Sequence, residues 1–455
     1  MSNYGKAIQL APHFAIAYLN RGGTYTKLKR YEEALVDYTQ AIRFNPNLAH
    51  IYMNRGITYE LLQRHEEALA DYTYAIRLDP NSAQIYYNRG LTYQVLKRDE
   101  DAIVDYTQTI RLDPNFAQAY TNLGVVYANL ERYEDALANY AQAIHLDPNL
   151  VEAYINRAIT YDLLQHYEES LTNYSQAIRL DPSNAYLYFS RGNSHKELQQ
   201  YEEAIPDYTQ AIYLDSSNTQ VYCNRGNTYR TLGLHQEAIA DYTQAIRLDP
   251  GQAQVFNNRG LSYYDLQQSE QALTDFTQAI HLDPNLVQAY TNRGLLYANQ
   301  RQYEDAFADF SHSIQLDPNV FQTYGNRAIA YQTLQRYEDA IADYTQFIHL
   351  NPNDPQAYNN RGIAFTSLQR YGEAFADFTK AIELDPNLDQ ADSNRRSLEQ
   401  LAFEALKGAD SIDQMKQAVL QFPFITDGEF IGVLQMVIAI TQKMSPMISF
   451  PLKND

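Results

Sequence analysis

Apolar and polar positions along this chain follow a pattern typical of short amphipathic helices. Near the N-terminus, Tyr18, Gly22 and Tyr25 are spaced by four and three residues. At about 100° per residue this spacing places them on one stripe of a helix. The segment YEEALVDYTQAIRF follows and has the same kind of stripe, with Ala34 and Tyr38 four residues apart. The pattern therefore predicts two amphipathic helices joined by a short connection near Lys29 and Arg30.

The helix pair recurs every 34 residues between residues 12 and 386, without an insertion or deletion. A fixed period in this range is typical of a solenoid, in which each unit buries its apolar face against its neighbours. Counting from Ala15 gives eleven units, 15–48 through 355–388. Prolines mark the period, and only Ser216 interrupts the series Pro12, Pro46, Pro80, Pro114, Pro148, Pro182, Pro250, Pro284, Pro318, Pro352 and Pro386.

The repeating residues resemble the tetratricopeptide repeat (TPR) family, including the long arrays of bacterial multi-TPR proteins. The family pattern has aromatic residues, Gly, Ala and Pro at fixed offsets within 34 residues. The first unit matches it with Tyr18, Gly22, Tyr25, Ala34, Tyr38, Ala41 and Pro46. The resemblance implies an all-α fold, a right-handed superhelical solenoid of helix-turn-helix repeats, with a concave groove lined by the first helices. Because recurring units share their surfaces, function is expected in surfaces that recur.

Local signals agree with two helices per unit. Asn47 is expected to cap the following first helix, because its side chain can accept from free backbone N–H groups. Glu32 and Glu33 begin a second helix and Arg43 ends it, which matches the helix macrodipole. The acidic pair recurs in later units, for example as Glu202 and Glu203. A solvated face that matches the dipole explains it, and acidic partner recognition is the alternative.

One departure from the family pattern is systematic. The seventh place of each unit, usually Leu in the family, is Arg in ten units, and only Leu123 differs. Sixteen residues later most units carry Asp, as in the pair Arg259 and Asp275. Asn139 follows Leu123, but Asn173 stands opposite Arg157 and weakens the rule. We expect structural ion pairs between the two helices, and an arginine row for phosphate or carboxylate ligands is the alternative.

The opposite stripe of the first helix contains the second, sixth, ninth and thirteenth places, which should face away from the second helix. The ninth place is mostly aliphatic, as in Ile57 and Leu91. The sixth place is Asn in almost every unit, with Ser190 as the exception: Asn20, Asn54, Asn88, Asn122, Asn156, Asn224, Asn258, Asn292, Asn326 and Asn360. The second place is usually Gln, as in Gln84, Gln118, Gln220, Gln254, Gln288, Gln322 and Gln356.

An amide side chain carries a donor and an acceptor, which match the N–H and C=O groups of an extended peptide. The row is similar to the asparagine ladders with which some TPR superhelices, including that of O-GlcNAc transferase, bind extended peptides. We therefore predict a protein–protein interaction scaffold that binds extended peptide segments in its groove. In the alternative, the asparagines bond within the scaffold, and a passive assembly scaffold works through the convex face or the C-terminal segment.

Composition and charge argue against several classes of binding partner. The 455-residue chain has a formal charge of −20, which argues against nucleic acid and against anionic membranes. The groove cations Lys27, Lys196 and Arg230 do not form a cluster, and no Lys or Arg stands at the second, fifth or sixth place, so the terminal-carboxylate clamp of chaperone adaptors is not expected. Cys223 is the only cysteine. No metal, cofactor or catalytic motif is found, so we expect a protein that is not an enzyme.

The two ends depart from the repeat. Residues 1–14 match the end of a second helix, so either the chain starts inside a repeat or this partial repeat is a cap. Residues 389–406 are expected to form a polar capping helix. From 407 to 455 we expect a small helical segment, with helices over 411–421 and 430–440, that packs on the last repeat or docks another protein. No secretory signal or spanning segment is found, since 430–440 is too short, and a cytoplasmic protein is expected.

Overall fold

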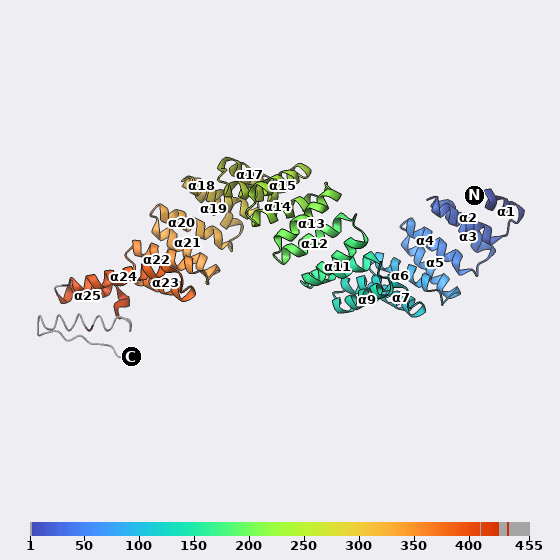
Figure 1. Ribbon diagram of the computed structural model, residues 1–455, viewed down its shortest axis with the longest axis horizontal. Coiled ribbons are helices and arrows are strands. Elements are labelled where there is room, and N and C mark those ends of the chain that lie inside the picture. Colours follow the sequence, from blue (N-terminus) through green and yellow to red (C-terminus); the bar gives the residue numbers. More distant parts are fainter. Residues whose placement is uncertain (1, 410, 427–434, 436–455) are drawn as a thin grey trace. The chain divides into compact units, whose positions relative to one another are not determined.

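The computed structural model describes residues 2–409, 411–426 and 435, and within these ranges the regular structure is helical throughout. Eleven helix pairs follow one another along the chain (Figure 1). The first helices all have 13 residues and are α2 (Ala15–Lys27), α4 (Ala49–Leu61), α6 (Ala83–Val95), α8 (Ala117–Asn129), α10 (Val151–Leu163), α12 (Ala185–Glu197), α14 (Thr219–Thr231), α16 (Ala253–Asp265), α18 (Val287–Asn299), α20 (Phe321–Thr333) and α22 (Pro355–Ser367).

The second helices all have 14 residues and are α3 (Tyr31–Phe44), α5 (His65–Leu78), α7 (Asp99–Leu112), α9 (Tyr133–Leu146), α11 (Tyr167–Leu180), α13 (Tyr201–Leu214), α15 (His235–Leu248), α17 (Ser269–Leu282), α19 (Tyr303–Leu316), α21 (Tyr337–Leu350) and α23 (Tyr371–Leu384). The ends contain α1 (Ser2–Leu10), α24 (Asp389–Lys407), α25 (Ile412–Gln421) and the 3₁₀ turn η1 (Pro423–Thr426). The predicted all-α array of helix-turn-helix repeats is confirmed.

The chain divides into two compact units, residues 1–232 and 233–455. The first unit contains α1 to α14, and the second contains α15 to α25 and η1. Within each unit the helices pack mainly against their neighbours in the chain, for example α2 against α3 and α16 against α17. This is the packing expected when each repeat buries its apolar face only against the adjacent ones.

A close contact between glycine and an aromatic ring holds the two helices of a repeat together. In repeat 4, a Cβ placed on Gly124 of α8 would lie 2.6 Å from Cε1 of Tyr140 on α9. Tyr140 is 1% exposed, so its ring fills the space that a larger residue at position 124 would need. The same contact recurs in repeat 9 between Gly294 and Phe310. The stripe that was predicted from spacing is therefore the interface between the two helices.

The turns between helices differ in one respect from the prediction. Leu48, and not Asn47, is the N-cap residue of α4, and its side chain accepts no cap hydrogen bond. The prediction for Asn47 was wrong because the preceding residue organises this turn: Asn45 Oδ1 accepts from the backbone N–H of Asn47 at 3.3 Å. Asp and Asn residues commonly bond the backbone two residues later in this way.

The connection inside each repeat contains a residue with positive φ at the fifteenth place, such as Lys29 with φ of 59°. The next residue, Arg30, is the N-cap of α3, and its guanidinium donates to Glu33 at 2.9 Å. This bond lowers the pKa of Glu33. The second acid of the recurring pair thus has a structural partner in this repeat, as the dipole interpretation favours.

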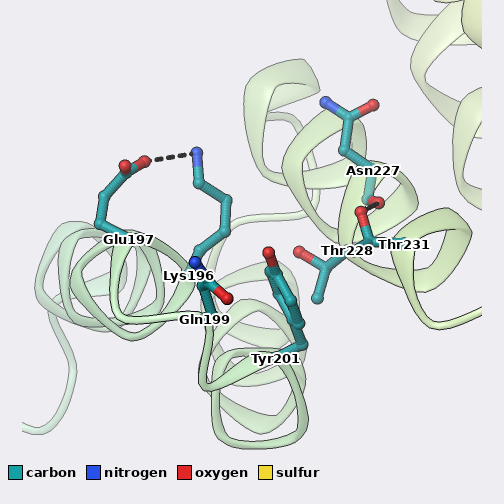
Figure 2. A pocket seen from close by; sticks show the side chains of 7 residues that line it. All are labelled: Lys196, Glu197, Gln199, Tyr201, Asn227, Thr228 and Thr231. Atoms are coloured by element: carbon teal, nitrogen blue, oxygen red, sulfur yellow. Dashed lines mark hydrogen bonds and ion pairs between the residues drawn. The ribbon is translucent and has the colours of Figure 1, made fainter. Parts of the chain in front are cut away.

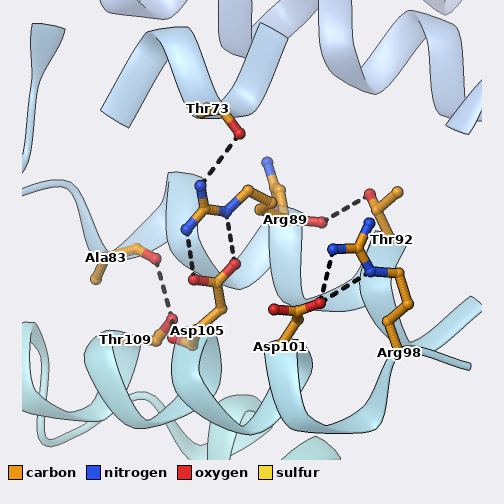
Figure 3. Close-up of polar contacts among 9 residues, drawn as sticks. Thr73, Ala83, Arg89, Thr92, Arg98, Asp101, Asp105 and Thr109 are labelled. Carbon is orange, nitrogen blue, oxygen red and sulfur yellow. Dashed lines mark hydrogen bonds and ion pairs between the residues drawn. The ribbon is translucent and has the colours of Figure 1, made fainter. Parts of the chain in front are cut away.

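The predicted ion pairs between the seventh and twenty-third places are present. In repeat 3, Arg89 donates from Nε and Nη2 to the two carboxylate oxygens of Asp105, at 2.7 Å each, and its Nη1 reaches Thr73 of the preceding repeat at 3.2 Å (Figure 3). The same pairs are Arg21–Asp37, Arg55–Asp71, Arg191–Asp207, Arg259–Asp275, Arg293–Asp309, Arg327–Asp343 and Arg361–Asp377. Apart from Arg21, these arginines also donate to a hydroxyl of the preceding repeat, so they connect two repeats and have a structural role.

Repeats 4 and 5 interrupt this network. Leu123 takes the arginine place in repeat 4 and is buried. Arg157 in repeat 5 donates from Nε to Asn173 Oδ1 at 2.7 Å. Burial lowers the pKa of Arg157, whereas the bond to Asp207 raises the pKa of Arg191 in the next repeat. A cation that is partly removed from water therefore has an amide partner at this place.

The C-terminal segment packs on the last repeat up to residue 426. Phe424 of η1 is stacked on Phe375 of α23, with ring centroids 4.2 Å apart, and Phe422 is stacked on Tyr371 at 4.7 Å. Both phenylalanines belong to a buried cluster with residues of α22, α23, α24 and α25. This contact agrees with packing on the last repeat for residues 411–426. The helix expected over 430–440 lies, apart from residue 435, outside the described residues.

Candidate functional site

Cavities lie between successive first helices, along the row of places that was expected to face the groove. One of about 450 Å³ lies between α2 and α4, one of about 360 Å³ between α12 and α14, and one of about 240 Å³ between α18 and α20. The first is lined by second-, sixth-, ninth- and thirteenth-place residues, including Ile16, Asn20, Gly23 and Lys27. The array thus forms recurring depressions between successive first helices.

The second-place glutamines are exposed on this surface: Gln84, Gln118, Gln220, Gln254, Gln288, Gln322 and Gln356. Four of them donate from Nε2 to Oδ1 of the asparagine one turn later, at 2.8–2.9 Å: Gln84 to Asn88, Gln220 to Asn224, Gln254 to Asn258 and Gln356 to Asn360. An amide has two donors and an acceptor oxygen with two lone pairs. These exposed amides therefore retain capacity for a partner.

The sixth-place asparagines lie at the seam between repeats. Asn20 is exposed, whereas Asn54, Asn88, Asn122, Asn156, Asn224, Asn258, Asn292, Asn326 and Asn360 are half-buried. Where the bond is resolved, Nδ2 donates to the first helix of the preceding repeat: Asn122 to the Tyr87 hydroxyl at 3.0 Å, Asn224 to Asn193 Oδ1 at 2.7 Å and Asn292 to Asn257 Oδ1 at 2.9 Å. These asparagines therefore join repeats, which was the alternative interpretation, and the role in peptide binding stays a prediction.

Large aliphatic side chains are also exposed on this surface. At the thirteenth place, Leu61, Val95 and Leu163 are 50%, 60% and 59% exposed. At the ninth place Leu91 is exposed and Ile57 is half-buried. All five residues are on first helices of the unit formed by residues 1–232. Repeated exposure of large aliphatic side chains on one face is a property of surfaces that bind other proteins.

Other candidate chemistry is limited. Among the residues that the structure describes, no group of His, Cys, Asp and Glu is arranged to hold a metal ion. No helix in the described part of the chain is long and apolar enough to cross a membrane. Cys223 is buried at the fifth place.

The sequence analysis named Lys196 only as an isolated cation near the groove and did not group it with its neighbours in the structure. Lys196, Tyr201, Asn227 and Thr231 line the cavity between α12 and α14 (Figure 2). The signal was present in the sequence, because Asn193 and Asn227 replace the aliphatic residue of the ninth place in two neighbouring repeats.

No curated protein matches the sequence. Among solved structures, the chain is similar to YrrB, described as a TPR protein with an unusual peptide-binding site, at 27% identity and a TM-score of 0.38 over 40% of this chain and 95% of that chain. It is similar to a tetratricopeptide repeat protein from Parabacteroides merdae ATCC 43184 at 22% identity and a TM-score of 0.46, over 55% and 98% of the two chains. Yeast Tom70 is similar at 17% identity and a TM-score of 0.42, over 93% and 99%.

Family models match along the array. A tetratricopeptide repeat model matches residues 15–48, 83–116, 117–150, 219–252 and 287–320. A second tetratricopeptide repeat model matches 326–389, and a TPR repeat model matches 61–97, 163–199, 192–233 and 260–301. Because these matches together cover more than half of the chain, the chain belongs to the tetratricopeptide repeat family, whose members are protein–protein interaction scaffolds.

Proposed function

We propose that this protein binds extended peptide segments of a partner protein along the face formed by its first helices. The observation that carries the proposal is the recurrence of depressions between successive first helices, all bordered by amide side chains. Aliphatic side chains also line the depressions between α2 and α4 and between α18 and α20. Pockets between helices that combine apolar walls with a few polar groups are typical binding sites. The depressions receive side chains of the peptide, and the exposed glutamine amides bond its backbone.

The glutamines suit this role better than the asparagines. Gln118, Gln288 and Gln322 are exposed, so bonding a peptide requires no rearrangement of the helix seam. Asn224 already accepts from Gln220 and donates to Asn193. We expect an asparagine of this kind to contribute one remaining N–H or lone pair and to hold the spacing of the first helices.

The competing proposal, a passive assembly scaffold that works through its convex face, rests on exposed apolar residues of the second helices. Val36, Val104 and Tyr213 are 61%, 65% and 82% exposed. The two surfaces can be separated by matched substitutions within one unit of the chain. Glu is tolerated at the thirteenth place, since Glu197 and Asp265 occupy it in other repeats.

The test selects peptides that bind the intact chain from a random peptide library displayed on phage. The triple variant Leu61→Glu, Val95→Glu and Leu163→Glu should lose most of the selected binding, because a charged group in the apolar row must be desolvated when a peptide covers it. The matched triple variant Val36→Glu, Val104→Glu and Tyr213→Glu should bind normally. If the first triple variant still binds the peptides and the second does not, the binding surface is the convex face and not the groove.

A further inference from the structure

The depression between α12 and α14 differs from the others in the chemistry of its walls. Lys196, Glu197 and Gln199 border it from the end of α12 and its loop, Tyr201 from the start of α13, and Asn227, Thr228 and Thr231 from α14. Figure 2 shows Lys196 and the hydroxyl end of Tyr201 on one side and Thr228, Thr231 and Asn227 of α14 on the other. Every named side chain in this lining is polar or charged.

The equivalent depression between α18 and α20 provides a matched comparison within the same chain. At the places held by Lys196 and Asn227, it has Ala298 and Ile329, and Leu295 and Ala330 add further apolar surface. Tyr303 stands in the same position as Tyr201. The rest of that lining includes the polar residues Asn299, Asn326 and Thr333 and the cation Arg301. The two depressions therefore differ at the places of Lys196, Asn227 and Thr228, which are polar or charged between α12 and α14 and apolar between α18 and α20.

The hydrogen-bond donors of this cavity point to an anionic ligand group. Thr228 and Thr231 already donate their hydroxyl protons to the backbone oxygens of Asn224 and Asn227, at 2.9 and 3.0 Å. The Lys196 ammonium has three N–H donors, and its Nζ lies 2.9 Å from Glu197 Oε1. The Lys196 ammonium is therefore the main charged donor that the cavity can present.

The existing ion pair does not prevent a second partner. The side chains of Lys196 and Glu197 are 34% and 47% exposed, and exposed pairs of this kind contribute little to stability. A carboxylate that enters the depression can therefore pair with Lys196, either beside Glu197 or in its place, at a small cost in free energy. It would also come within reach of the Tyr201 hydroxyl, which borders the same space.

We propose that the depression between α12 and α14 binds the side-chain carboxylate of an Asp or Glu residue in the bound peptide, with Lys196 as the charge partner. This proposal rests on the proposed function, because the peptide backbone must lie along the first helices for its side chain to reach the cavity. It makes repeats 6 and 7 a specificity element that selects an acidic position within an extended segment.

The experiment uses the same displayed library on the intact chain and on two variants. Lys196→Gln removes the charge and introduces a residue that the fold accepts at this place, since Gln94 and Gln332 occupy it in repeats 3 and 10. Lys97→Gln removes one charge from a loop where Gln is the common residue, as in Gln63 and Gln165, and serves as the control. Glu197→Gln removes the competing carboxylate.

Peptides selected by the parent chain should carry a recurrent Asp or Glu, and replacing that residue by Asn or Gln should weaken binding about threefold to tenfold, less so at high salt. Lys196→Gln should abolish this discrimination, Lys97→Gln should retain it and Glu197→Gln should strengthen binding. An acidic preference that persists in Lys196→Gln, or selected peptides without one, overturns the inference while the groove proposal stands. If the parent chain selects no peptide, the proposed function itself fails.

Discussion

The incomplete polar network of repeat 5 allows a direct test of how the repeats are held together, through the substitution Asn173→Asp. In the parent chain Arg157 Nε donates to Asn173 Oδ1 at 2.7 Å, and Asn173 Nδ2 donates to the backbone oxygen of Glu169 at 2.7 Å. In repeat 6, Asp207 instead accepts two bonds from Arg191, at 2.8 and 2.6 Å. The variant should form the same two-bond pair in repeat 5.

The magnitude follows from three contributions. A second bond to a charged group contributes about 1.5–3 kcal/mol, and loss of the bond to Glu169 costs about 0.5–1.5 kcal/mol. Burial of the new carboxylate opposes this gain in stability. In two equivalent pairs, burial raises the pKa of Asp105 and of Asp377, although the bond to the arginine lowers each pKa. We therefore expect a net gain of about 1 kcal/mol in the local free energy of unfolding, because Arg157 is already partly removed from water.

Amide hydrogen exchange is the suitable assay, because a repeat array need not unfold in one cooperative step and the effect should stay local. Protection of the slowest amides of α10 and α11 should rise about fivefold, which corresponds to about 1 kcal/mol. In an Arg157→Gln background the same substitution should lower protection, since the new carboxylate would lack its cation. Reduced protection in Asn173→Asp alone, or an equal gain without the arginine, would refute the reasoning.

Three further changes test other parts of the argument. Gly124→Ala should be about 1–3 kcal/mol less stable than Gly23→Ala when each is compared with the parent, because a Cβ at Gly124 meets the Tyr140 ring at 2.6 Å whereas Gly23 has only an ordinary contact at 3.7 Å; equal effects on thermal melting would contradict the close-contact explanation. Burial raises the pKa of Tyr140 to about 12, so the stability that the neutral hydroxyl contributes below its ordinary pKa is lost as the pH rises through about 12. Tyr140→Phe should therefore lose less stability than the parent between the ordinary pKa and about pH 12. If the melting temperatures of both proteins fall equally with pH, this hydroxyl does not contribute. Phe424→Ala should cost about 3–5 kcal/mol locally and raise hydrogen exchange in α25 while earlier repeats stay protected; unchanged exchange in α25 would exclude the stacked contact with Phe375 as its anchor.

The residues of the candidate surface could largely be predicted from spacing, but which of them bond within the scaffold and which stay exposed could not. The second, sixth, ninth and thirteenth places do line the depressions between first helices, as helical periodicity required. The partner of each amide was not predictable, because Asn224 and Asn193 are 31 residues apart and meet only when adjacent repeats stack. The predicted N-cap at Asn47 was wrong for a local reason, since the side chain of Asn45 bonds the backbone of Asn47 in the turn and Leu48 takes the N-cap position.

The sequence by itself determined the repeat length, the two helices of each repeat and the Arg–Asp pairing, because each depends on residues at fixed offsets within one 34-residue unit. Arg259 and Asp275 could be paired from spacing alone, and the structure contains that pair at 2.8 Å. Only the tertiary structure decided which polar side chains join repeats and which remain available, because that depends on the distance between successive first helices. It placed Lys196 and Asn227, which lie in different repeats, on one cavity, since stacking brings the end of one first helix beside the middle of the next.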